Sequence, residues 1–258
     1  MRIFIITDIE GTSGVWRWEQ GDRNSPWYLQ AVRLATAELL ACLDGIREVA
    51  ADAHICIWDA HGSGSIDFEQ VPSGCELLNA VSVPLPELFG EGWDALFFVG
   101  QHSKAGTARG VLAHTYSSST IERFAINGLE MGEFGCRAAL AGSYDIPTAF
   151  ISGDEAAVAE ARALVPNIYG APVKVGLGPQ LARHLAPPDA CALIRENAAA
   201  ATRGYGSVSP MRLGEGPYTQ EIRVSLKMEP VHLLGRSFTQ LDLQNYVKTS
   251  DSLADLWI

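Results

Sequence analysis

The sequence has no long hydrophobic run, no excess of basic residues and no charged leader segment before its first apolar stretch. No apolar stretch approaches the roughly 20 residues that a membrane-spanning helix requires, and the chain enters a short apolar segment directly at Ile3. We therefore expect a cytoplasmic protein with no membrane partner. The formal net charge of −11 at pH 7 argues against a nucleic-acid partner, because binding to phosphates requires a basic surface.

Several common functional motifs are also missing. The five cysteines are scattered without a CxxC pair, and their odd number is typical of reduced, mostly buried thiols instead of a disulfide scaffold or a structural zinc site. There is no GxSxG nucleophile motif. The glycine-rich segments 11–14 and 62–65 fit neither GxGxxG nor GxxxxGK[ST]. These absences exclude the commonest serine-hydrolase and nucleotide-binding signatures.

Short apolar runs alternate with longer amphipathic segments, which is typical of an α/β fold. The chain of 258 residues is 47% hydrophobic and 19% charged, enough for a full core. We expect a mostly parallel sheet flanked by helices. The strands are predicted at residues 3–6, 55–58, 95–99 and 147–152, and the helices at 26–47, 131–142 and 155–164.

The signals weaken after residue 166, where we expect a smaller C-terminal α+β part. It is predicted to contain a helix over 187–201, a strand over 221–226 and a closing helix over 241–256. Asn127-Gly128 predicts a hairpin turn. We expect a single domain over residues 1–258, with two lobes as the alternative; the sequence marks no clear boundary past residue 100.

Three predicted strands run directly into polar loops that carry potential metal ligands. Asp8 and Glu10 follow the first strand and, two residues apart in extended backbone, would lie on one face. Two adjacent buried anions repel each other unless a cation lies between them. The alternative is that Asp8 is a turn residue and Glu10 is solvated. His61 and His102 follow the next two strands. Because ligands bind where the carboxyl ends of parallel strands converge, we expect these four residues to meet.

Glu133 is a fifth candidate ligand. It lies in the first turn of a predicted helix, where it could instead serve only the helix dipole. With it, two imidazoles and three carboxylates form a mixed set that favours zinc, manganese, cobalt or iron over magnesium or calcium. Five ligands exceed one tetrahedral shell but fit two ions roughly 3.5–4 Å apart, as hydrolases use. The other histidines, His54, His184 (in a predicted helical segment) and His232, are expected to be structural.

Taken in order, five short motifs make the chain resemble the D-aminopeptidase (dipeptide-transport-operon) family of zinc metallopeptidases over roughly residues 1–165. The motifs are Asp8-x-Glu10-Gly, Asp59-Ala-His61, Gly-Gln-His102, Leu-Ala-His114 and Asn127-Gly-Leu-Glu-Met-Gly-Glu133. The resemblance implies that Asp8, Glu10, His61, His102 and Glu133 bind two zinc ions, and that His114 is the nucleophile or general base. It also implies an α/β fold and a ring-shaped homodecamer.

We therefore expect a zinc-dependent aminopeptidase that hydrolyses short peptides or amides with an N-terminal D-amino acid. Asp8 would bridge the ions, and we favour proton transfer for His114 because a metal-activated water is already a good nucleophile. The alternatives are another two-metal hydrolase, such as a phosphoesterase or an L-specific peptidase, and a non-catalytic metal-binding protein. Only Arg109 and Lys104 lie near the ligands in sequence, which weighs against a phosphoesterase. We expect Lys104 to be a solvated surface residue in preference to a substrate contact.

Overall fold

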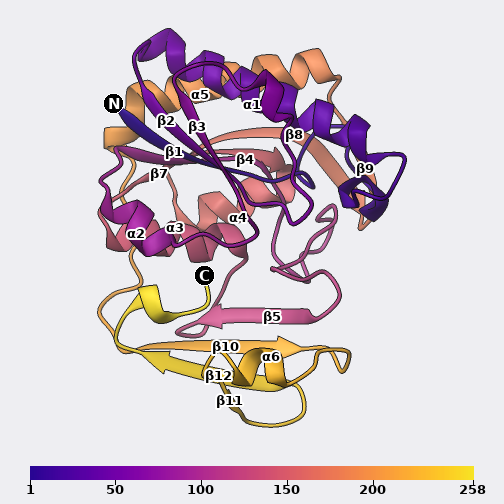
Figure 1. Ribbon diagram of the computed structural model, residues 1–258, viewed down its shortest axis with the longest axis vertical. Helices are drawn as coiled ribbons and strands as arrows, with labels where there is room; N and C mark the ends of the chain where they lie inside the picture. Colours follow the sequence, from indigo (N-terminus) through magenta and orange to yellow (C-terminus); the bar gives the residue numbers. More distant parts are fainter.

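The computed structural model describes residues 1–258 and contains two separate sheets (Figure 1). The larger sheet has seven strands in the order β3-β2-β1-β4-β7-β8-β9. Every pair of neighbours is parallel except β8 and β9. Its strands are β1 (Arg2–Thr7), β2 (His54–Asp59), β3 (Cys75–Asn79), β4 (Ala95–Gln101), β7 (Thr148–Asp154), β8 (Tyr169–Gly178) and β9 (Leu181–His184). The predicted α/β class is confirmed.

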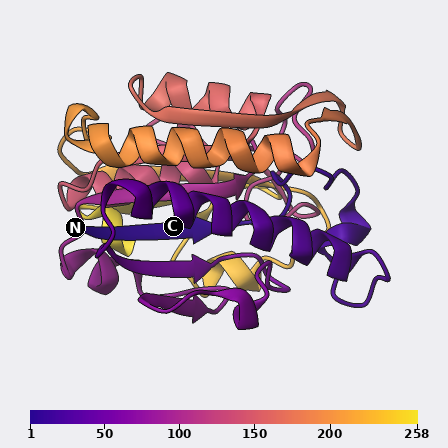
Figure 2. The ribbon, with the colours of Figure 1, turned by 90° about the horizontal axis from the view of Figure 1, so that it is seen from above.

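Helices cover both faces of the larger sheet (Figures 1 and 2). The two long helices α1 (Tyr28–Val49) and α5 (Pro187–Gly204) run side by side over one face. They approach closely at Gly45, where a Cβ would lie 2.3 Å from the carbonyl oxygen of Arg195. The opposite face carries α2 (Leu85–Gly90), α3 (Glu133–Ser143) and α4 (Glu155–Leu164). No helix is both long enough and apolar enough to cross a bilayer.

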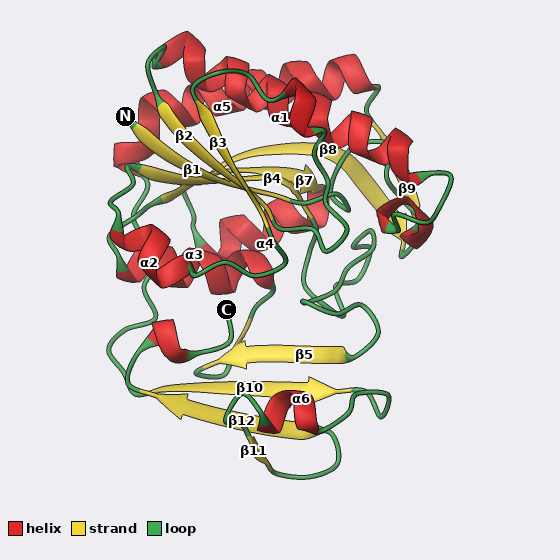
Figure 3. Ribbon diagram, in the orientation of Figure 1, coloured by secondary structure: helices red, strands yellow, loops and turns green.

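The smaller sheet is antiparallel and lies beyond α2, α3 and α4 (Figure 3). Its order is β11-β12-β10-β5-β6, and the short helix α6 (Val231–Leu234) accompanies it. The strands are β5 (Ile121–Ile126), β6 (Leu129–Glu130), β10 (Tyr218–Val224), β11 (Thr239–Gln240) and β12 (Asn245–Ser250). Short 3-10 turns occur at Trp18–Gly21, Phe68–Gln70, Tyr205–Ser207 and Leu253–Asp255.

The hairpin predicted at Asn127-Gly128 joins β5 to β6. Both residues have positive φ, 51° and 75°, which is the geometry that makes Asn-Gly favourable in a tight hairpin. One hydrophobic cluster of 56 buried residues includes side chains of both sheets, such as Phe97 in β4 and Ile222 in β10. The division into one domain or two lobes stays a prediction.

Two predictions for the chain after residue 166 are wrong. The closing helix over 241–256 is absent: residues 245–250 form β12, which pairs with β10, and only a 3-10 turn follows. Leu241 and Leu243 are 65% and 78% exposed, so they do not form the buried stripe that a packed helix requires. His184 lies at the end of β9 instead of in a helix, and its Nδ1 accepts a hydrogen bond from the amide of Gly14.

Candidate metal centre

The loops after β1 and β4 are held against each other by glycine. The amide of Gly11 donates to the carbonyl oxygen of Gly100 at 2.8 Å. A Cβ at Gly11 would lie 2.2 Å from the carbonyl oxygen of Gln101, and Gly100 has a φ of 74°. Only glycine permits this approach without strain. The close contact brings the carboxylates after β1 beside the histidine after β4.

The first group of potential ligands consists of Asp8, Glu10 and His61, whose ligand atoms all lie within 4.8 Å of one another. Nε2 of His61 lies 3.5 Å from Oε1 of Glu10, and both carboxylates are buried. The loop that carries His61 is folded around Asp59, which accepts hydrogen bonds from the amide and hydroxyl of Ser65. Asp59 therefore positions the loop after β2.

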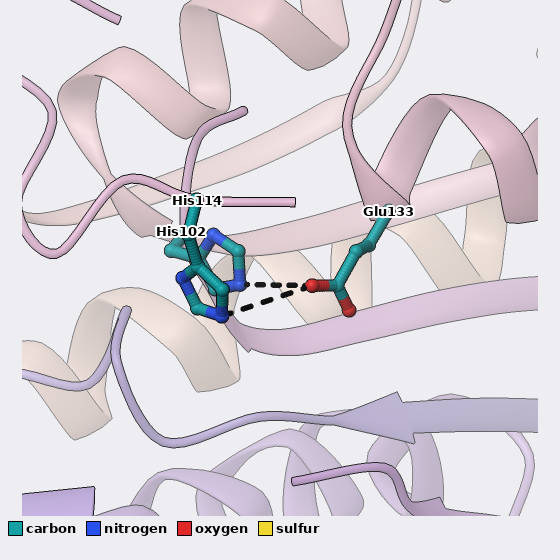
Figure 4. Close-up of side chains that lie close together, drawn as sticks. All are labelled: His102, His114 and Glu133. Carbon is teal, nitrogen blue, oxygen red and sulfur yellow. Dashed lines mark ion pairs between the residues drawn. The ribbon is translucent and has the colours of Figure 1, made fainter. Parts of the chain in front are cut away.

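The second group consists of His102, His114 and Glu133 (Figure 4), whose ligand atoms also lie within 4.8 Å of one another. The two imidazole rings stack with centroids 3.9 Å apart and an angle of 16° between their planes. Oε1 of Glu133 lies 3.5 Å from Nε2 of His102 and 3.9 Å from Nε2 of His114. Nε2 of His102 also lies 3.3 Å from Oδ2 of Asp8, which joins the two groups. All six residues selected from the sequence are therefore brought together, with His114 among the potential ligands.

The three histidines share one hydrogen-bonding pattern. Each Nδ1 lies 2.9–3.1 Å from a backbone carbonyl oxygen, of Gly64 for His61, Ser103 for His102 and Leu112 for His114. A carbonyl oxygen only accepts, so these contacts favour a proton on Nδ1, and in the neutral imidazole Nε2 then has the lone pair that binds a metal. A ring nitrogen fixed in this way by a backbone carbonyl is usual for metal-binding histidines.

Two residues that the sequence did not single out hold Glu133. The Arg137 guanidinium forms an ion pair with its Oε2 at 3.0 Å, and the Tyr116 amide donates to its Oε1 at 2.9 Å. Arg137 is only 3% exposed, and its ring neighbours Trp58 and Tyr116 lie 4.7 and 5.8 Å from its guanidinium carbon. Its position at i+4 from Glu133 was the available sequence signal.

A buried lysine from β8 holds the loop after β1. Nζ of Lys174 donates to the carbonyl oxygens of Glu10, Thr12 and Val15, with the last bond 2.6 Å long. The same loop is held from α1 by Glu38, whose Oε1 accepts from the amide of Ser13 at 2.8 Å. Neither residue carries a signal in the sequence, because each looks there like an ordinary surface charge.

The buried charges shift one another's protonation. Burial, reinforced by the charge of Glu10, raises the pKa of Asp8 to about 7. Burial opposes the ionisation of both Glu10 and His61. Their mutual attraction is stronger: it lowers the pKa of Glu10 well below its usual range and raises the pKa of His61 to about 9. The pKa of His114 is lowered by burial and then by the charge of His102. The protonation of each buried group thus depends on the charges of its neighbours.

Zinc fits the residues present. Two ligands at 2.0–2.1 Å from a tetrahedral zinc ion lie roughly 3.3 Å apart, close to the 3.3–3.5 Å between the paired nitrogen and oxygen atoms here. Oε2 of Glu10 and Nε2 of His102 are buried without a hydrogen-bond partner, which is costly unless another species binds them. Mixed imidazole and carboxylate donors are typical ligands of zinc.

A cavity of about 210 Å³ opens beside these groups. Asp8, His61, His114 and Glu133 line one side of it. The remaining lining comes largely from aromatic and aliphatic residues and includes two arginines, Arg137 and Arg236. A buried cluster of potential metal ligands that faces such a cavity, at the carboxyl ends of parallel strands, is typical of metal-dependent hydrolases.

Comparison with known proteins gives the family. The model of the peptidase M55 family, described as D-aminopeptidase, matches residues 1–231. The chain therefore belongs to this family and is a peptidase. A D-aminopeptidase of Bacillus subtilis (strain 168) is 29% identical over 230 residues, covering 84% of this chain and 79% of the relative.

A solved structure shares the fold. It is the Zn-dependent D-aminopeptidase DppA from Bacillus subtilis, described as a self-compartmentalizing protease. The two structures superpose with a TM-score of 0.90, covering 99% of this chain and 93% of the other, at 22% sequence identity. The mixed α/β fold with its mostly parallel sheet is thus common to both proteins.

Proposed function

We propose that the protein is a zinc-dependent aminopeptidase that binds two zinc ions per chain and removes an N-terminal D-amino acid from short peptides. The observation that carries the proposal is the pair of ligand groups joined through Asp8 and His102, 3.3 Å apart. Asp8 belongs to the first group and contacts His102 of the second, so it would help to hold both ions. The proposed ligands are Asp8, Glu10, His61, His102 and Glu133. Zinc is supported by the donor set and by the structural relative, which is Zn-dependent.

Two zinc ions, when bound, polarise the scissile carbonyl and lower the pKa of a water molecule toward neutrality. The residues of the chain then have to bind the substrate and move its protons. His114 is placed for proton transfer: its Nδ1 is tied to the Leu112 carbonyl oxygen, and its Nε2 faces the cluster. Because its pKa is lowered by burial, His114 is neutral at neutral pH and accepts a proton that it passes to the leaving amine.

The Trp18 and His114 rings meet edge to face with centroids 5.5 Å apart, and the His102 ring stacks on His114. This packing fixes the plane of the imidazole, which a proton-transfer group requires. We favour this role over direct attack by His114 on the carbonyl, since activated water supplies the nucleophile.

The test is metal content per chain, measured together with hydrolysis of D-Ala and L-Ala p-nitroanilide. Wild type is compared with Glu10→Ala and with Glu130→Ala, a control at an exposed glutamate outside the cluster. We expect two zinc ions and D-selective cleavage in wild type and in the control, and loss of both in Glu10→Ala. Two ions without cleavage of either isomer would discard the substrate, and a wild type without tightly bound metal would discard the site.

The family resemblance also supports a homodecamer, and the description of the structural relative as self-compartmentalizing agrees with an oligomer. Sedimentation of the purified protein tests this, with an expected mass ten times the 27.8 kDa of one chain. All five cysteines are free, which suits the reducing cytoplasm as the site of action.

A further inference from the structure

One wall of the cavity is a continuous stack of aromatic rings and guanidinium groups. The Arg137 guanidinium lies against Trp58 and Tyr116, and the Tyr116 ring stacks on Trp257 with centroids 5.2 Å apart. The Arg236 guanidinium carbon then lies 4.8 Å from the centre of the Trp257 ring. All five residues line the cavity. The stack therefore leads from Glu133, which Arg137 binds, to Arg236 at its other end.

The two arginines of this wall differ in what they bind. Arg137 is buried and its charge is matched by Glu133. Arg236 is exposed and forms no ion pair. Lys104, the cation near His102 in the sequence, pairs with Glu130 at 3.2 Å and does not line the cavity. Arg236 is thus the unpaired cation of the cavity.

The ring beneath Arg236 is held rigidly. The backbone of Trp257 exchanges two hydrogen bonds with the side chain of Gln220: its amide donates to Oε1 at 3.1 Å, and its carbonyl oxygen accepts from Nε2 at 2.9 Å. Gln220 is completely buried in β10. A guanidinium stacked on a fixed ring loses less freedom when it binds an anion, which favours affinity.

The size and charge of the cavity limit what it binds. Its volume of about 210 Å³ lies below the roughly 300–1,000 Å³ of pockets for drug-sized ligands. A short peptide whose first residue reaches the metal ligands ends in a carboxylate, and arginine binds carboxylates through two parallel hydrogen bonds. Arg236 and Trp257 lie beyond residues 1–231, the part that the family model matches.

We propose that Arg236 binds the C-terminal carboxylate of the substrate and makes the enzyme selective for di- and tripeptides with a free carboxylate over the corresponding amides. This inference rests on the proposed aminopeptidase function. Arg236 acts as a specificity residue, since it contacts the end of the substrate away from the scissile bond.

The experiment compares D-alanylglycine with D-alanylglycinamide. We measure kcat/KM for both in wild type, Arg236→Gln and Arg236→Lys. The matched control is Arg223→Gln, at an exposed arginine of β10 that pairs with Glu122 and does not line the cavity. We expect wild type and the control to prefer the free acid by about 10–100-fold, the scale of a charge-assisted hydrogen bond. The ratio of kcat/KM for the free acid to that for the amide should fall toward one in Arg236→Gln and be partly restored in Arg236→Lys.

Calorimetric binding of the same two compounds separates this inference from the proposed function. One outcome is that wild type cleaves neither compound and still binds the acid more tightly than the amide. If Arg236→Gln lacks this binding preference, the carboxylate site stands and the proposed function fails. Equal binding of acid and amide by wild type, or a preference that Arg236→Gln retains, overturns the role of Arg236.

Discussion

Arg137 and Glu133 lie one turn apart on α3 and form an ion pair, with Nη2 of Arg137 3.0 Å from Oε2 of Glu133. This bond leaves Oε1 facing the two stacked histidines. Groups that orient a ligand typically contribute 10–100-fold to metal affinity.

The first prediction follows from this bond. Arg137→Met should weaken zinc binding by about 10–100-fold, because Glu133 loses the partner that fixes it. Arg137→Lys keeps the positive charge but lacks the planar guanidinium group. Its zinc affinity should therefore lie between those of wild type and Arg137→Met. Competition against a chromophoric chelator measures the affinity. A folded Arg137→Met protein that binds zinc as tightly as wild type would show that the bond has no part in metal binding.

The second prediction concerns His114. Replacement by alanine should lower kcat by about 10²–10⁴ while both metals stay bound, since five other ligands remain. His54→Ala, at a partly exposed histidine stacked on Trp93, serves as the control. Metal analysis and kinetics are made on the same samples. Loss of metal along with activity would make His114 a ligand, as its place beside His102 and Glu133 also allows.

The third prediction concerns the lysine of β8. Lys174→Met removes the donor for three carbonyl oxygens of the loop that carries Glu10. Leaving buried acceptors unpaired should lower the free energy of unfolding by about 3 kcal/mol. Urea unfolding of the metal-free proteins measures this, with Lys248→Met, at a partly exposed lysine, as the control. If both variants unfold at the same urea concentration as wild type, Lys174 does not hold the loop.

The fourth prediction is a pH dependence of stability. Burial raises the pKa of Glu38 from 4.5 to about 8, so between these values the folded protein holds a proton that the unfolded chain has released. Wild-type stability should therefore fall as pH rises through this window, by about 1.4 kcal/mol per unit. Glu38→Gln has no titratable carboxyl group at this position. Its free energy of unfolding relative to wild type should therefore rise from pH 5 to pH 8. Contributions of the metal ligands cancel in the difference, and a difference independent of pH would contradict the prediction.

The central strands and their loops are predictable from the sequence for a simple reason. The apolar runs at 3–6, 55–58 and 95–99 are too short for helices, and each ends in a polar loop. Their parallel pairing in β1, β2 and β4 then places Asp8, His61 and His102 at one edge. α4 has the predicted bounds, Glu155–Leu164, because an alanine-rich amphipathic segment carries a local signal.

Elements that depend on distant partners are not predictable in this way. β8 contains glycines and a proline, and it is a strand because β7 and β9 pair with it. β12 is fixed by β10 in the same manner. Lys174 becomes recognisable only through its burial, because a single charged residue in a sequence does not reveal whether it faces water or buried carbonyl groups.

The ligand-bearing loops follow the adjacent strands β2, β1 and β4, whereas Arg236 belongs to the neighbourhood of the smaller sheet. The proposed metal ligands and the proposed carboxylate site therefore lie at two different sheets of one chain. Under this proposal, substitutions around β11 and α6 change the choice of peptide while the strands that carry the proposed metal ligands stay the same. Such a layout separates the choice of substrate from the centre that breaks the bond.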